Sequence, residues 1–393
     1  MTNHLQPPQS RLARTAGAAL VAALTLVHAA PAQTFKMLYA FNGGNDGANP
    51  QGRLVLFAGN LYGTTATGGG SNLGTIFQLN IKSLDKTVLY SFGGSPGDGA
   101  LPLAGLIADS FGSLYGTTRG GGANGNGAVF QMNPLATTVM HSFGAPPDGA
   151  QPLDSLAMDA QGNFYGVTYE GGKTGGTGTV FKMDPSGNLT ILHSFVGEPN
   201  ALGSEPVAGL LPIGNYLYGT NINGALATSG GTVFRTDIKT GKTSLLYAFS
   251  GGADGGNPQG QLITDGQGNL YGTTLGGGSG HAGVIYKLNI TTHQQTVLHT
   301  FSGGDGDGPA SGLLRDSQGN FYGTTLDGGA AGMGVVYKMT PSGALTVLHS
   351  FLGPEGAYPY ATPVMDSSGN LYGVTNAYGP SGNNGTVYEI TMP

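Results

Sequence analysis

A Tyr-Gly pair that recurs seven times is the feature of this sequence that most constrains its fold. Residues 268–274, with the sequence GNLYGTT, contain the fifth copy. Successive copies are 50 to 53 residues apart, and their tyrosines are Tyr62, Tyr115, Tyr165, Tyr218, Tyr271, Tyr322 and Tyr372. A fixed period of this length is typical of repeat architectures, in which each repeat is one supersecondary unit.

Each repeat contains four short runs with the composition of β-strands. In the fifth repeat these runs, named a to d in chain order, are residues 261–264, 269–274, 283–288 and 296–301. β-Branched and aromatic residues occupy the centres of the runs, and glycine-rich turns separate them. The pattern predicts an all-β fold, a seven-bladed β-propeller with four antiparallel strands per blade.

The two ends of the repeat region complement each other. The seventh repeat contains runs a to c but no run d, whereas residues 36–41 match the strand-d run at residues 87–92. A propeller closes well when its last blade takes a strand from the first residues, because this pairs an edge that would otherwise stay open. We therefore expect residues 36–41 to pair with residues 385–390, in a single propeller domain that spans residues 33–393.

The first 32 residues have the three regions of a secretory signal peptide. Arg11 and Arg14 supply the positive charge, residues 16–27 are largely apolar, and residues 30–32 (Ala-Pro-Ala) fit a small-residue cleavage site. The sequence thus predicts export to the periplasm or the extracellular space, with a mature chain that begins at Gln33. The alternative is a buried N-terminal helix.

The mature chain is acidic and has no cysteine. It has 13 basic and 21 acidic side chains, a net charge of −8. We exclude nucleic acid as a partner, because phosphate binding requires clustered Lys and Arg. The lack of cysteine excludes disulfides and thiolate metal sites. No stretch of the mature chain has the roughly 18 to 20 apolar residues of a membrane helix, and we expect a monomer without a cofactor.

The repeat unit resembles a known family. GNLYGTT in strand b, GTVFKM-like runs in strand c and LHSF in strand d, followed by a DGA-P segment, are similar to the GloVer tandem-repeat proteins. These are bacterial exported repeat proteins, and the resemblance covers residues 35–390. It implies a propeller-type repeat and export, and it brings no assigned catalytic residues.

Residues that recur in every blade are expected to be structural, because one binding site does not need seven copies. The Tyr-Gly pairs should pack between adjacent blades, with the glycine letting backbones approach; a tyrosine-lined ligand channel is the alternative. The position two residues before the last Phe of strand d is either Tyr or His in every blade. A position that accepts both needs a flat ring with a polar tip, which argues against a metal site there. The residues at this position are Tyr39, Tyr90, His141, His193, Tyr247, His299 and His349.

An acidic residue precedes a glycine in six of the seven d–a loops, which connect strand d of one blade to strand a of the next. An Asp-Gly pair followed by a proline is first of all a turn signal. Asp305 and Asp307 alternate along one of these loops and are the candidate calcium ligands. The full ligand run of an EF-hand loop is absent, however, so we expect no metal.

The d–a and b–c loops of a propeller lie on one face, where ligand sites usually form across the central channel. Glu170 and Asp327 are the candidate catalytic carboxylates, but their blades face each other across the ring, and glycoside hydrolysis needs carboxylates about 5 to 10 Å apart. A solvated loop rim is the alternative. The candidate ligand-binding residues differ between blades: Arg119, Tyr169, Glu170, Asp327, Asn376, Tyr358, Tyr360 and Tyr378.

Three classes of function fit these observations. The first is a secreted binding or scaffold module for a glycan, a peptide or a cell-surface partner, which the Tyr and Asn side chains favour by stacking and hydrogen bonding. The second is a glycan hydrolase or lyase on the same scaffold. The third is a purely structural envelope or matrix protein. Binding leads among the three, and catalysis comes last.

Overall fold

The computed structural model describes residues 1, 33–94, 97–133, 136–173, 176–196, 202–224 and 230–393. Gln33–Met392 form one compact unit. Apart from Met1, the leader expected over residues 1–32 lies outside the described residues, so its cleavage site stays a prediction. Within the described residues, no helix has the length and apolar character needed to cross a membrane.

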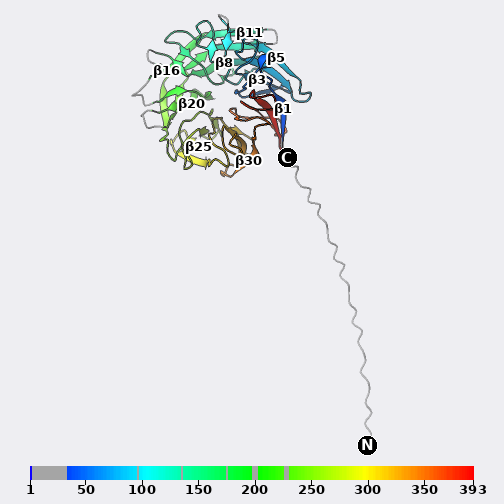
Figure 1. Ribbon diagram of the computed structural model, residues 1–393. Coiled ribbons are helices and arrows are strands. Elements are labelled where there is room, and N and C mark those ends of the chain that lie inside the picture. The colour runs from blue at the N-terminus through cyan, green and yellow to red at the C-terminus, as the bar shows by residue number, and fades with distance from the viewer. Residues whose placement is uncertain (2–32, 95–96, 134–135, 174–175, 197–201, 225–229) are drawn as a thin grey trace. The chain divides into compact units, whose positions relative to one another are not determined.

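Seven antiparallel sheets follow one another around a ring within this unit, as Figure 1 shows, and this confirms the seven-bladed propeller. In blades 1 to 6 strands a, b, c and d lie side by side in chain order. Blades 1 to 3 contain β2 (Val55–Phe57), β3 (Asn60–Thr65), β4 (Thr75–Asn80) and β5 (Lys86–Ser91); β7 (Ile107–Ala108), β8 (Leu114–Thr118), β10 (Ala128–Asn133) and β11 (Ala136–Ser142); and β13 (Ala157–Met158), β14 (Phe164–Thr168), β16 (Gly176–Met183) and β17 (Leu189–Val196).

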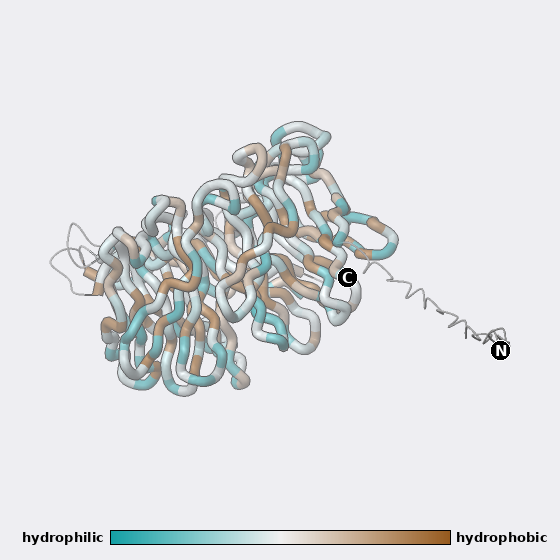
Figure 2. Tube along the Cα trace, turned by 90° about the horizontal axis from the view of Figure 1, so that it is seen from below, coloured by the Kyte–Doolittle hydropathy of each residue, from teal (hydrophilic) through white to brown (hydrophobic). Residues whose placement is uncertain are grey.

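The later blades repeat this arrangement. Blades 4 to 6 contain β19 (Leu211–Ile213), β20 (Tyr216–Asn223), β21 (Thr232–Asp237) and β22 (Thr243–Ala248); β23 (Ile263–Thr264), β24 (Asn269–Thr274), β25 (Val284–Asn289) and β26 (Gln295–Thr300); and β27 (Leu314–Arg315), β28 (Phe321–Thr325), β29 (Val335–Met339) and β30 (Leu345–Ser350). Along the tube in Figure 2, hydrophobic segments alternate with hydrophilic turns, as expected for strands packed between neighbouring blades.

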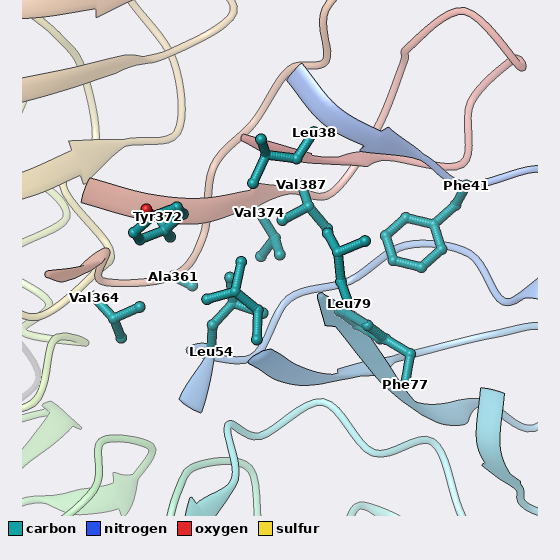
Figure 3. Packing of buried hydrophobic residues seen from close by; sticks show 11 residues of the cluster. Leu38, Phe41, Leu54, Phe77, Leu79, Ala361, Val364, Tyr372, Val374 and Val387 are labelled. Carbon is teal, nitrogen blue, oxygen red and sulfur yellow. The ribbon is translucent and has the colours of Figure 1, made fainter. Parts of the chain in front are cut away.

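The seventh blade is closed by the N-terminal strand. It contains β31 (Val364–Met365), β32 (Leu371–Thr375) and β33 (Thr386–Thr391), and β1 (Thr34–Ala40) pairs antiparallel with β33. Leu38 and Phe41 are buried and belong to one cluster with Val387 of β33 and Leu79 of blade 1 (Figure 3). The predicted closure of the ring is therefore confirmed.

A buried lysine connects the closing strand to the first blade. Lys86 Nζ lies 2.6 Å from Asp46 Oδ1, and the side chain of Lys86 is only 3% exposed. The same ammonium group is 5.6 Å from the ring centroid of Tyr39 and 5.4 Å from that of Phe41. Charge pairing and cation–π attraction thus act together where the two ends of the repeat region meet.

The recurring Tyr-Gly pair is structural, as its seven copies predicted. The tyrosine ring packs against the neighbouring blade: Tyr115 lies 4.7 Å from Phe164 between ring centroids. The glycine has a different role from the expected close approach of backbones. A Cβ added at Gly116 would lie 2.7 Å from Phe130 of strand c, so the missing side chain makes room for an aromatic ring of the same blade.

In five blades the hydroxyl group of this tyrosine is hydrogen-bonded to the turn that precedes strand b. Tyr322 donates a hydrogen bond to Asp316 in the a–b turn at 3.0 Å. Equivalent bonds to an a–b turn aspartate are made by Tyr115, Tyr165, Tyr271 and Tyr372. Each of these tyrosines therefore combines packing between blades with one hydrogen bond.

The flat rings of strand d bind the acidic residues of the d–a loops. His299 Nε2 lies 2.8 Å from Asp305 Oδ2, and Tyr247 donates to Asp254 at 2.9 Å. The same aspartates accept backbone N–H groups of their own loop, as Asp254 does from Ser250. The ring position and the acidic position are thus one structural pair, which accounts for their joint recurrence.

Candidate functional site

Short ladders tie each d–a loop to the b–c loop of the same blade. In blade 3, β12 (Gly149–Ala150) pairs with β15 (Glu170–Gly171). The other blades have β6 (Gly99–Ala100) with β9 (Gly120–Gly121), β18 (Ser204–Pro206) with β20, and bridges at Ala48↔Thr67, Gly256↔Gly276, Asp307↔Asp327 and Ala357↔Ala377. These ladders place both loops on one side of the ring, which we call the d–a face.

A left-handed residue precedes the proline of every d–a loop. Tyr358 has a φ of 57°, and its carbonyl accepts a hydrogen bond from Asn376 N at 3.1 Å. Left-handed backbone is unfavourable for side chains other than glycine, and such strain often accompanies functional sites. The seven residues are Asn49, Leu101, Gln151, Glu205, Asn257, Gly308 and Tyr358. The sequence analysis missed most of this set, although its place before a recurring proline is a readable signal.

Three of the candidate residues form one cluster on blades 2 to 4. Gln151 accepts a hydrogen bond from Arg119 Nε at 3.1 Å and donates to Glu170 at 3.0 Å. Next to it, Tyr169 donates to Glu205 at 3.0 Å, and burial followed by this hydrogen bond raises the pKa of Tyr169. Side chains of neighbouring blades are therefore held in fixed positions relative to one another.

A second cluster gathers on blade 7. The rings of Tyr358 and Tyr378 lie 6.0 Å apart between centroids. Asn376 accepts a hydrogen bond from Gln51 Nε2 of blade 1 at 3.2 Å. Tyr360 and Tyr378 are 40% and 42% exposed, which is unusual for such large side chains in this chain. The cluster thus combines aromatic surface with amide groups.

Asp327 lies apart from both clusters. Its backbone bridges that of Asp307, and two like charges directly opposite each other on paired strands repel. Burial first, and then the charge of Asp307, raise the pKa of Asp327. The other calcium candidate, Asp305, is held by His299 and Ser302 instead of facing Asp307. Among the described residues no group of three or more acidic or histidine side chains is placed to hold a metal.

The central channel contains a cavity of about 270 Å³ that opens among the d–a loops. Its charged lining residues are Arg53 of blade 1 and Asp154 of blade 3. Below it lies a second cavity of about 440 Å³, lined mainly by apolar side chains of strand a. Arg53, Ser155 and Gln261 line both cavities and therefore lie where the two cavities adjoin.

The two channel charges are held differently. Asp154 accepts hydrogen bonds from Ser155 N at 2.6 Å and from Gly209 N at 2.5 Å. Burial raises the pKa of Asp154, against the effect of these bonds and of the Arg53 charge. Burial lowers the pKa of Arg53, and the charge of Asp154 partly offsets this. The Arg53 side chain lines the channel and is exposed to its solvent.

Neither channel charge was predicted from the sequence. They follow the recurring proline of the d–a loop, where Gly, Ala or Ser occupies the position of Asp154 in the other six blades. A carboxylate at a position that is small in all other blades could have identified Asp154 as a candidate residue. Its partner Arg53 was not recognisable without the ring geometry, because the two residues are 101 positions apart.

The model of the Gloeobacter/Verrucomicrobia repeat family matches residues 17–231 and 215–393. The chain belongs to this family. The resemblance drawn from the repeat unit is thereby confirmed. No curated protein matches the sequence.

Solved structures share the propeller fold at low sequence identity. An oligogalacturonate lyase from Vibrio parahaemolyticus matches with a TM-score of 0.58 and 11% identity, over 92% of this chain and 97% of the lyase. PorZ, a surface component of the type-IX secretion system of Porphyromonas gingivalis, matches with a TM-score of 0.56 and 14% identity. This match covers 90% of the present chain and 48% of PorZ. At these identities the likeness concerns the fold alone.

The candidate residues thus fall into separate groups on the d–a face. Arg119, Tyr169 and Glu170 lie together, Asn376 lies with Tyr358 and Tyr378 on blade 7, and Tyr360 lines the channel cavity. Glu170 belongs to blade 3 and Asp327 to blade 6, and they share neither a hydrogen bond nor a cavity among the described residues. Whether any of these side chains binds a ligand or acts in catalysis stays a prediction.

Proposed function

We propose that this protein is an exported binding propeller whose d–a face recognises a glycan at the mouth of the central channel. One observation carries this proposal. Equivalent backbone positions on this face present side chains that vary widely from blade to blade, whereas the Tyr-Gly and ring–acid pairs repeat inside the blades. Variable side chains on a uniform, rigid scaffold are what a specific binding surface requires.

A glycan is favoured by the chemistry of the blade 7 cluster. Tyr360 and Tyr378 offer exposed aromatic surface, and Gln51 and Asn376 offer amide groups beside it. Such flat rings supply contact area at low cost in conformational entropy, and amides exchange hydrogen bonds with hydroxyl groups. Export to the periplasm or cell exterior, which the leader indicates, would bring this face to surface polysaccharides. A peptide or surface protein is the alternative ligand, and a purely structural role is the alternative to binding.

Catalysis has one observation in its favour. Asp327 has a raised pKa beside Asp307, and perturbed carboxylates are common at catalytic sites. The pair lies outside the channel cavity, however, and among the described residues no second acid or base is hydrogen-bonded to the side-chain carboxylate of Asp327. We therefore place binding first.

A panel of neutral and acidic oligosaccharides tests the proposal. We expect the wild-type protein to bind at least one member, and Tyr378→Ala to weaken that binding by about tenfold or more, as for a buried aromatic anchor. Phe111→Ala is the matched control, because Phe111 is 90% exposed in an a–b turn on the other face. Equal losses in both variants, or no binding at all, would overturn the proposal. Cleaved products in the panel would favour the enzyme.

A further inference from the structure

Arg53 is a cation without an acceptor in a confined space. Its guanidinium group carries five N–H donors. Among the described residues it makes no hydrogen bond, and no carboxylate lies within 4 Å of it. The side chain is exposed to the solvent of the channel, although the protein groups around it lower its pKa. A guanidinium group held in this way is complementary to an anionic acceptor, above all to a planar carboxylate.

The nearby carboxylate does not fill this role. Both oxygens of Asp154 are already engaged by backbone N–H groups of Ser155 and Gly209. The carboxylate of Asp154 is thus bound to the backbone of blades 3 and 4. The cavity lies between this carboxylate and Arg53. A second anion at Arg53 would be repelled by Asp154 unless the rest of the ligand presented hydrogen-bond donors to that side.

The remaining polar lining supplies acceptors for such donors. Gln51, Gln259 and Gln261 each donate through Nε2 to fixed protein oxygens, at 3.2, 3.1 and 3.1 Å. These bonds orient the three amides, and no described residue donates to their Oε1 atoms. The channel therefore offers one fixed cation and several oriented acceptors, a pattern that matches one carboxylate and several hydroxyl groups.

We infer that the channel cavity binds a polyhydroxy carboxylate of monosaccharide size, such as a uronic acid unit, with its carboxylate on Arg53 and its hydroxyl groups toward Asp154 and the glutamines. The volume of about 270 Å³ lies just below the range of drug-sized sites, which fits one sugar unit. This inference rests on the proposed glycan recognition and deepens it. The d–a face would hold the chain of the glycan, and the channel would hold one acidic unit.

Titrations with D-glucuronate, D-glucose and acetate test the inference, with binding followed by NMR or calorimetry. We expect wild-type protein to bind glucuronate more tightly than glucose, which lacks the carboxylate, and than acetate, which lacks the hydroxyl groups. Arg53→Gln should weaken glucuronate binding by about tenfold or more, because a charge-assisted hydrogen bond is lost, and should leave glucose binding unchanged. Among the described residues the Arg53 side chain makes no hydrogen bond or ion pair and interacts with Asp154 only at a distance, so the variant should fold normally, which its melting curve checks.

Arg315→Gln is the matched control, because Arg315 lies over the ring of Phe321 at 5.9 Å and lines neither channel cavity. It should bind glucuronate as the wild type does. The inference is wrong if wild-type protein does not bind glucuronate, if Arg53→Gln binds it equally well, or if acetate binds as tightly. A neutral oligosaccharide that still binds in a Tyr378-dependent manner would then leave the proposed function intact, whereas loss of all glycan binding would remove both.

Discussion

At the residue scale, one buried aromatic position of strand c is tyrosine in three blades and phenylalanine in the other four. Tyr286, Tyr337 and Tyr388 are fully buried, and no described residue pairs with their hydroxyl groups. Each hydroxyl lies over the glycine of a Tyr-Gly pair, as that of Tyr337 does over Gly323. Burial raises the pKa of Tyr337, so the hydroxyl stays protonated. An unpaired buried hydroxyl costs free energy without packing benefit.

Removing such a hydroxyl should stabilise the protein. We expect Tyr337→Phe to raise the free energy of unfolding by about 1 kcal/mol, because the unsatisfied group is lost and the ring remains. Tyr322→Phe is the control: its hydroxyl donates to Asp316, and we expect it to cost about 1 to 3 kcal/mol. Denaturant unfolding of both variants measures the difference. A less stable Tyr337→Phe would contradict the assignment of an unsatisfied group.

Single residues were predictable from the sequence where they recur. The ring of Tyr115 between blades follows from comparing one blade with the next. The pairing of His299 with Asp305 was not predicted, although both positions recur in the sequence. Contacts that occur once were not predictable. Gln151 joins Arg119 of blade 2 to Glu170 of blade 3, and Arg53 and Asp154 line one channel cavity only because the ring closes.

At the scale of elements, strand b was predicted best. The run expected at residues 269–274 is β24 without any shift, and the runs for strands c and d differ from β25 and β26 by one residue. Strand a is shorter than expected: β23 contains only Ile263 and Thr264. Gln261 faces the channel and approaches Gly312 of the next blade, so its backbone does not join the sheet.

The closing strand is the element on which the ring most depends. We expect a chain that begins at Asn45 to aggregate or to melt far below one that begins at Gln33. Loss of β1 exposes the edge of β33 and removes Leu38 and Phe41 from the core. Each such side chain contributes roughly 1.5 to 3 kcal/mol, against a total stability of about 5 to 15 kcal/mol. Thermal melting and size-exclusion chromatography provide the comparison, and equal melting temperatures would refute this role of β1.

At the scale of the whole molecule, repetition and variation are separated in space. The blades share one set of packing contacts, and these make the scaffold rigid. Variation concentrates in the d–a and b–c loops, which the short ladders hold on one face. A uniform ring can therefore carry a specific surface without any change to its core, and this division is the basis of the proposed glycan recognition.

Hydrogen exchange with and without the tightest-binding oligosaccharide of the panel tests this central claim most directly. Ligand bound at the d–a face should suppress local opening and slow exchange of backbone amides there, including those of Tyr358 and Asn376, which bond within the loop ladders. Amides of the a–b turns at residues 109–113 and 265–269 on the other face should exchange at unchanged rates. Protection confined to the a–b turns, or no protection in the presence of saturating ligand, would contradict the account.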